Sequence, residues 1–81
     1  SSVELTQHFI RRIEKLDAKL NSLITINSDL ALQRAAEADR QLAKGEANPL
    51  CGVPYIHKDI FCTQGIRTSC ASRMLHDFIA P

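Results

Sequence analysis

The stretch that decides the fold is Gly52-Val53-Pro54-Tyr55-Ile56-His57-Lys58-Asp59-Ile60-Phe61. Its apolar residues fall on both alternations of an extended chain, so the pattern predicts a strand that is buried on both faces. Such a strand belongs inside a sheet with covering layers, and a chain of 81 residues offers little to cover it. We therefore expect a fragment of a larger α/β domain.

Three polar residues, His57, Lys58 and Asp59, interrupt this apolar run. Burial lowers the pKa of a lysine because it penalises the charged ammonium, and the neutral amine can then serve as a general base. In that case the Asp59 side chain should point away from Lys58, as strand alternation allows. The alternative is a lysine at a strand end, with its stem packed and its ammonium in water or paired with Asp59. His57 is either a structural or a catalytic histidine.

The segment that follows, residues 63–72, is rich in hydroxyl and small side chains. It could line a site with its backbone groups, or form a tight surface turn followed by a short strand. Residue chemistry leaves both interpretations open.

Two helices are expected before the strand. The first begins at a capping box, because Ser1 and Glu4 have the S-x-x-E spacing. Its apolar stripe consists of Phe9, Ile13, Leu16 and Leu20. After a short β-prone run at residues 23–26, Asn27 or Ser28 can cap a second helix that runs to Lys44, with Gly45 as the C′ residue. The packing face of this helix consists mainly of small side chains: Ala31, Ala35, Ala38 and Leu42.

The composition disfavours several classes of function. Lys and Arg number 10 against 9 Asp and Glu, so the net charge of +1 disfavours a broad basic face for nucleic acid. No uncharged stretch approaches the roughly 20 residues that cross a bilayer. The odd number of cysteines, without a CxxC pair, favours reduced thiols. The alternative is a zinc site, although the spacings match none of the usual ligand patterns; its ligands would come from Cys51, His57, Cys62, Cys70 and His76.

Residues 52–75 closely resemble the amidase signature family, and the most specific piece is the continuous stretch at residues 57–63. The resemblance extends back through residues 2–6, residues 20–25 and the Ala-rich helix, and forward through residues 77–81. Within the family, the chain resembles most the branch of the tRNA-dependent amidotransferases. The sequences Cys62-Thr63 and Thr68-Ser69-Cys70 favour this branch.

The resemblance implies an α/β/α sandwich with a mixed sheet, of which residues 1–81 would be the N-terminal part. Residues 1–45 would form a helical layer, and residues 52–81 the first core strand or strands. It also implies a Ser–Ser–Lys triad in which Lys58 is the general base. Both serines belong to a Gly/Ser-rich segment that these 81 residues lack, and Ser69 and Ser72 lie outside that motif. Ala71 stands where the family commonly has glycine.

The implied activity is glutamine hydrolysis, which supplies ammonia for converting Glu-tRNA(Gln) or Asp-tRNA(Asn) to Gln-tRNA(Gln) or Asn-tRNA(Asn) with ATP. The implied partners are a B and a C subunit, together with the misacylated tRNA that their complex would bind. ATP and Mg²⁺ would be used mainly at the B subunit, so no cofactor or metal is assigned to this chain. The implied location is the cytoplasm, or the organellar matrix in a eukaryote, with no membrane partner.

With one triad member of three, the 81 residues alone are expected to be inactive, and their uncovered apolar strand is expected to promote self-association. Two other interpretations stay open. One is another hydrolase of the same family that acts on a free amide. The other is a helical interaction module without chemistry.

Overall fold

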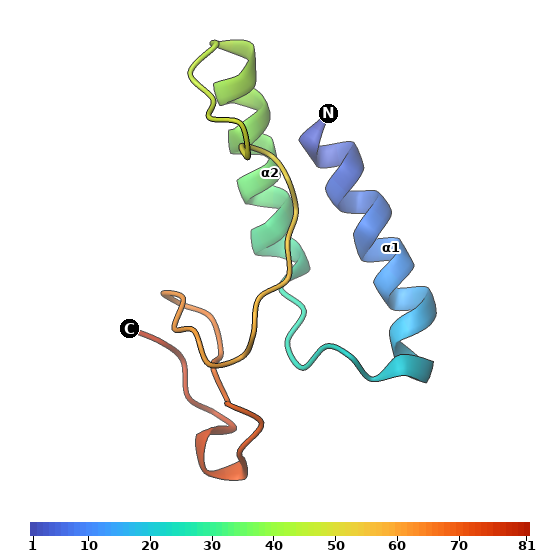
Figure 1. The fold of residues 1–81 in the computed structure, drawn as a ribbon, viewed down its shortest axis with the longest axis vertical. Helices are drawn as coiled ribbons and strands as arrows, with labels where there is room; N and C mark the ends of the chain where they lie inside the picture. Colours follow the sequence, from blue (N-terminus) through green and yellow to red (C-terminus); the bar gives the residue numbers. More distant parts are fainter. The chain divides into compact units, whose positions relative to one another are not determined.

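The computed structural model describes residues 1–81, which form two α-helices, one 3₁₀ turn and no β-strand (Figure 1). Helix α1 spans Ser2–Leu20, helix α2 spans Ser28–Ala43, and the 3₁₀ turn η1 spans Arg73–Leu75. The chain divides into two compact units. The first, a helical unit, comprises Ser1–Ser22 and Asn27–Tyr55, and the second, a turn-rich unit, comprises Leu23–Ile26 and Ile56–Pro81.

Helix α1 begins where the capping box predicts. The Ser1 hydroxyl accepts a hydrogen bond from the Glu4 amide at 3.2 Å, and the Glu4 carboxylate returns to the amino group of Ser1 at 3.5 Å. The helix ends at Asn21, whose φ of 49° is left-handed and whose amide donates to the Asp17 carbonyl at 2.7 Å. The predicted start of the first helix is confirmed.

Helix α2 also agrees with its sequence pattern. Asn27 occupies the N-cap position, although its side chain makes no capping hydrogen bond, and Lys44 is the C-cap. Gly45 follows with a φ of +73°, a conformation that a side chain disfavours and that typically ends a helix. The second helix and its C′ glycine are therefore confirmed to within one residue.

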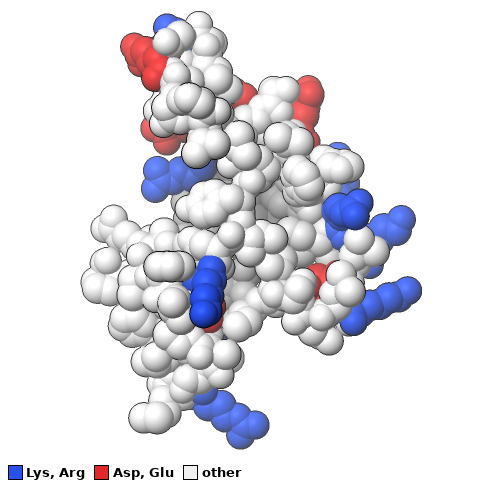
Figure 2. Space-filling model, viewed as in Figure 1, with Lys and Arg blue, Asp and Glu red and all other residues white.

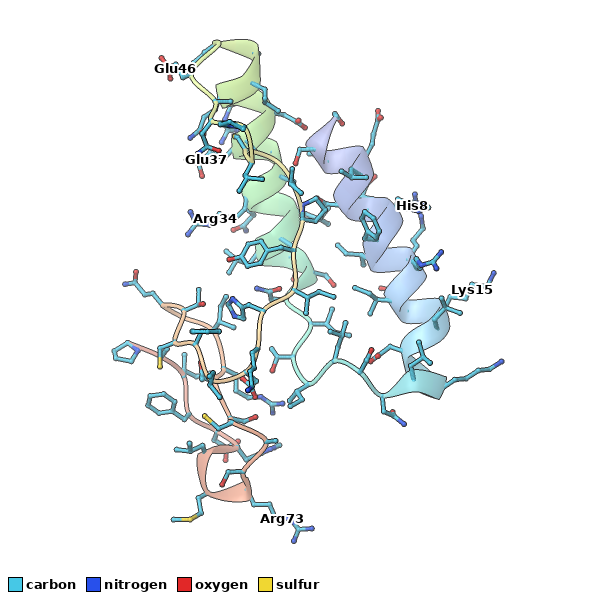
Figure 3. All side chains as sticks on the ribbon, in the orientation of Figure 1. His8, Lys15, Arg34, Glu37, Glu46 and Arg73 are labelled. Carbon is cyan, nitrogen blue, oxygen red and sulfur yellow. The ribbon has the colours of Figure 1, made fainter.

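The two helices lie side by side and run in opposite directions (Figure 1). The middle of the predicted small-residue face is buried, with Ala35 only 5% exposed. The ends of the apolar stripe on α1 are not covered, since Phe9 is 44% and Leu20 68% exposed. His8 and Lys15 point away from α2 (Figure 3). The hairpin thus buries a narrow seam of small side chains and leaves larger apolar ones open.

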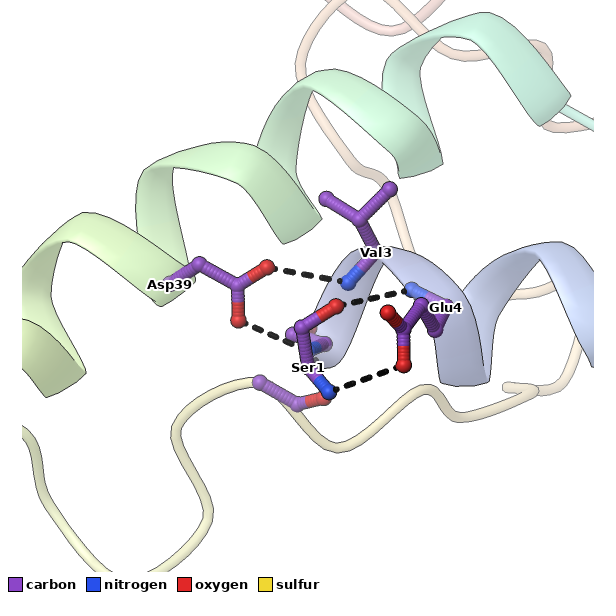
Figure 4. Close-up of polar contacts among 6 residues, drawn as sticks. Ser1, Val3, Glu4 and Asp39 are labelled. Carbon is purple, nitrogen blue, oxygen red and sulfur yellow. Dashed lines mark hydrogen bonds and ion pairs between the residues drawn. The ribbon is translucent and has the colours of Figure 1, made fainter.

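A side chain of α2 caps the start of α1. The Asp39 carboxylate accepts the Ser2 amide at 2.7 Å and the Val3 amide at 3.1 Å (Figure 4). These are orphan donors at a helix N-terminus, where a negative charge is also favoured by the helix dipole. Hydrogen bonds from the Ser2 and then the Val3 amide hold the pKa of Asp39 below its ordinary value.

The strand predicted at residues 52–61 is wrong for this structure. These residues form turns and irregular backbone, and the Phe61 amide bonds back to the Lys58 carbonyl at 3.3 Å. The expected burial on two faces is also absent, because Tyr55 is 78% and Ile56 70% exposed. A strand needs a neighbour for its backbone groups, and no segment of these 81 residues pairs with this one. Residues 23–26 likewise form no strand.

Extended pairing occurs later in the chain instead. Arg67 and Ile79 form an isolated antiparallel bridge. Around it the Gly65 amide donates to the Ala80 carbonyl at 2.8 Å, and the Thr68 amide donates to the Phe78 carbonyl at 3.0 Å. The α/β/α sandwich and its mixed sheet stay a prediction, since the structure contains two helices and one bridge.

The face in Figure 2 is mostly uncharged, and both basic and acidic side chains project from it. Neither helix combines the length and the hydropathy of a membrane-spanning segment.

Candidate functional site

Lys58 lies at the surface of the turn-rich unit. Its ammonium forms no hydrogen bond or ion pair within the chain, and only its backbone carbonyl is engaged, by the Phe61 amide. The ring of His57 meets that of Phe61 edge to face, with centroids 6.2 Å apart. The burial predicted for Lys58 is absent here, and its amine is not committed to any partner.

The residues around Lys58 are apolar and uncovered. Ile56 is 70%, Ile60 52% and Phe61 57% exposed. Three large apolar side chains gathered this closely along the chain mark a surface that favours contact with another apolar surface. Lys58 therefore lies in a segment whose apolar side chains are not packed against other residues of this chain.

Asp59 is held by Ser69. Both carboxylate oxygens lie 3.2 Å from the Ser69 amide nitrogen, and the Ser69 hydroxyl donates to Oδ2 at 2.5 Å. The Cys70 amide donates to the Asp59 backbone carbonyl at 3.0 Å. The Ser69 hydroxyl is the main reason that the pKa of Asp59 is lowered, and the Ser69 and Ala71 amides and the Arg67 charge act in the same direction. Asp59 therefore accepts these donors rather than pairing with Lys58.

The segment that binds Asp59 is tightly turned, and its first two residues are buried. Thr68 and Ser69 are each only 4% exposed. Cys70 and Ala71 follow with φ values of 51° and 57°, both in the left-handed region. That region is unfavourable for a residue with a Cβ, which explains why glycine is suited to the position of Ala71.

Of the residues singled out in the sequence, the structure brings Asp59 and Ser69 together, a contact that no spacing rule predicts. The hydroxyl-rich composition of residues 63–72 was the available signal. The zinc candidates do not converge, because no three His, Cys, Asp or Glu side chains are placed to share a metal ion. All three cysteines are free. An open, mainly apolar hollow of about 360 Å³ is lined by Leu50, Val53 and Tyr55.

Comparison with known families identifies the class of protein. The family model described as Amidase matches residues 4–81, nearly the whole chain, and the chain belongs to this family.

Three similar proteins share one name. The chain is 62% identical over all 81 residues to the A subunit of the glutamyl-tRNA(Gln) amidotransferase of Cellvibrio japonicus, and 60% to the protein of that name from Methylococcus capsulatus. It is 59% identical to the one from Thioalkalivibrio sulfidiphilus. In each case the match covers 100% of this chain and 17% of the relative, so the chain spans about a sixth of the length of these proteins.

Proposed function

We propose that the protein containing this chain is the glutamine-hydrolysing subunit of a tRNA-dependent amidotransferase, with Lys58 as its general base. The observation that carries the proposal is the 62% identity, over every residue of the chain, to a protein named as the A subunit of such an enzyme. Membership in the amidase family supports the reaction class, which is cleavage of an amide bond.

The proposed chemistry uses two serines from outside these 81 residues. The hydroxyl of one serine attacks the side-chain amide carbonyl of glutamine, and the second serine relays its proton towards Lys58. Ammonia leaves, and water then hydrolyses the resulting ester to give glutamate. A serine hydroxyl is a weak nucleophile until a neighbouring base accepts its proton, which is the role assigned to the Lys58 amine.

Two features of the structure support Lys58 in this role. Its ammonium has no partner within the chain, so no ion pair has to be broken before it acts. Its apolar neighbours are exposed, and covering them would place the amine in a low-dielectric site that favours the neutral, basic form. By themselves, the 81 residues are proposed to be inactive, because a base without a nucleophile cannot cleave an amide.

The proposed partners are a B and a C subunit, with misacylated tRNA bound through their complex. ATP and Mg²⁺ would act mainly at the B subunit. The complex would work in the cytoplasm, or in the organellar matrix if the source is eukaryotic.

The test is to follow label from glutamine in the full-length protein assembled with its B and C subunits. With amide-¹⁵N glutamine, ATP and Mg²⁺, we expect glutamate to form and the label to enter Gln-tRNA(Gln) or Asn-tRNA(Asn). Hydrolysis of simple amides without any transfer to tRNA would favour a free-amide hydrolase. Absence of any amide cleavage would leave a binding role for the helical unit and would refute the proposal.

A further inference from the structure

We propose that Asp59 is a positioning residue for Lys58, and that Ser69 is the group that makes it one. Ser69 holds the Asp59 carboxylate, and this contact fixes the backbone beside Lys58 and keeps the negative charge away from the Lys58 ammonium. The inference rests on the proposed function, because it assigns a role to the residue next to the proposed base.

Asp59 is anchored through both its side chain and its backbone. The Asp59 carboxylate accepts the Ser69 amide and hydroxyl, and the Asp59 carbonyl accepts the Cys70 amide. Side chain and main chain of Asp59 are thus both tied to the same short segment. Because Lys58 shares a peptide bond with Asp59, this double attachment also restricts the direction in which Lys58 leaves the backbone.

Lys58 and Asp59 are neighbours of opposite charge. A regular strand would send the side chains of Lys58 and Asp59 to opposite faces, but the structure has no strand here. Two oppositely charged neighbours in irregular backbone are free to pair, and a carboxylate near an ammonium stabilises its charged form. The donors of Ser69 prevent this pairing by engaging the carboxylate instead.

The segment that supplies those donors has an unfavourable backbone conformation. Cys70 and Ala71 adopt consecutive left-handed conformations, each of which is disfavoured for a residue with a Cβ. The turn is closed by the Ser72 amide, which donates to the Ser69 carbonyl at 2.8 Å. Ser69 is 4% exposed, so water does not compete with Asp59 for the hydrogen bond of its hydroxyl. This unfavourable turn presents both donors of one buried serine to one carboxylate. Such an arrangement indicates a functional contact.

Two further charged or titratable side chains bear on this contact. Arg67 favours the ionised form of Asp59, while its Nε donates to the Thr25 hydroxyl at 3.3 Å. His57 precedes Lys58 and packs against Phe61. Neither supplies a second carboxylate, so Asp59 is the acidic group whose placement matters for Lys58.

The experiment measures kcat/KM for glutamine against pH in the full-length complex. In Ser69→Ala, the freed carboxylate should stabilise the Lys58 ammonium and move the acidic limb of the profile upward by about one pH unit. Adding Asp59→Asn to Ser69→Ala removes the carboxylate and should return the limb to its wild-type position. Ser69→Thr, which keeps the hydroxyl, should retain the wild-type profile.

Asp59→Glu provides a second route if Ser69→Ala does not fold. The longer side chain keeps the charge but places it beyond Ser69, so the same upward shift is expected, whereas Asp59→Asn should give none. Ser72→Ala is the matched control, since its hydroxyl accepts only the Met74 amide within the same segment. It should leave the profile unchanged.

The proposal is overturned if Ser69→Ala lowers the rate equally at every pH or leaves the profile in place, because either result means a structural role alone. It is equally overturned if the double variant keeps the shift. Lys58→Ala in the same assay separates the two levels of inference. Wild-type turnover in Lys58→Ala removes the proposed function itself, whereas an inactive Lys58→Ala with an unshifted Ser69→Ala removes only the role of Asp59.

Discussion

The helical unit and the turn-rich unit are built in different ways. Both ends of helix α1 carry bonds between residues three to five positions apart, such as the Glu4 amide to the Ser1 hydroxyl, and the Asp39 carboxylate of α2 adds a long-range cap at its start. In the turn-rich unit the main contacts join residues ten or more apart, such as Asp59 with Ser69 and Gly65 with Ala80. The helix boundaries of the first unit are therefore specified mainly by local sequence, whereas these bonds of the second unit depend on contacts that only the folded chain supplies.

Apolar surface stays open in both units. In the helical unit Ala35 is buried at the seam, but Leu20 is 68% and Leu50 77% exposed. In the turn-rich unit Ile56, Ile60 and Phe61 are more than half exposed, and Lys58 lies among them. The segment with the proposed catalytic base is therefore one whose apolar side chains lack cover within these 81 residues.

Among changes in stability, the largest is expected at the helical seam. Ala35→Leu should destabilise the protein by about 1–3 kcal/mol, because Ala35 is 5% exposed and a larger side chain has no room between the helices. Ala43→Leu, at the exposed last residue of α2, is the matched control and should have little effect. Thermal unfolding followed by circular dichroism measures both. Equal stability of the two variants would mean that the seam is not closely packed.

Opposite signs are expected for the same alanine-to-glycine change in the two units. Ala71→Gly should stabilise by roughly 1 kcal/mol, because the left-handed φ of 57° is unfavourable for alanine and free for glycine. Ala18→Gly, on the exposed side of α1, should destabilise by about 1 kcal/mol through loss of helix propensity. Chemical denaturation of both variants tests this, and a loss of stability in Ala71→Gly would contradict the turn described here.

The two helices were predictable from the sequence, whereas the backbone of residues 52–61 was not. The S-x-x-E spacing at Ser1 and Glu4 and the glycine at position 45 predicted both helices, because caps act within one helical turn. The apolar run at residues 52–61 predicted a strand buried on both faces, and the structure shows neither the strand nor the burial. Periodicity reports which side chains avoid water, whereas a strand also requires a partner for its backbone.

The candidate site was predictable only in part. The resemblance of residues 57–63 pointed to Lys58, whose role stays a prediction. The contact between Asp59 and Ser69 was not predictable, because it depends on two consecutive left-handed residues at positions 70 and 71. Neither of these is glycine, so the sequence carries no ordinary signal of that turn.

The smallest effect is expected from acid. The pKa of Asp39 is lowered below 3.8 by the Ser2 and Val3 amides of α1, so its stabilising contribution is present above pH 3.8 and is lost as the pH falls through the folded-state value. Asp39→Asn should weaken the dependence of helix stability on pH in this acid range. Glu37→Gln, on an exposed position of the same helix, should retain it. Thermal melts between pH 2 and pH 5 compare the two, and identical behaviour would show that Asp39 does not cap α1.

The most direct test of the account is the rate of glutamine hydrolysis by Lys58→Ala in the full-length protein with its partner subunits. The account predicts that the rate falls about a thousandfold or more, because the base is lost. The fold should stay intact, because the Lys58 side chain is exposed and makes no hydrogen bond or ion pair within this chain. Lys58→Arg should fail equally, since a guanidinium does not act as a base near neutral pH. Turnover close to wild type in either variant would contradict the assignment of Lys58 as the base.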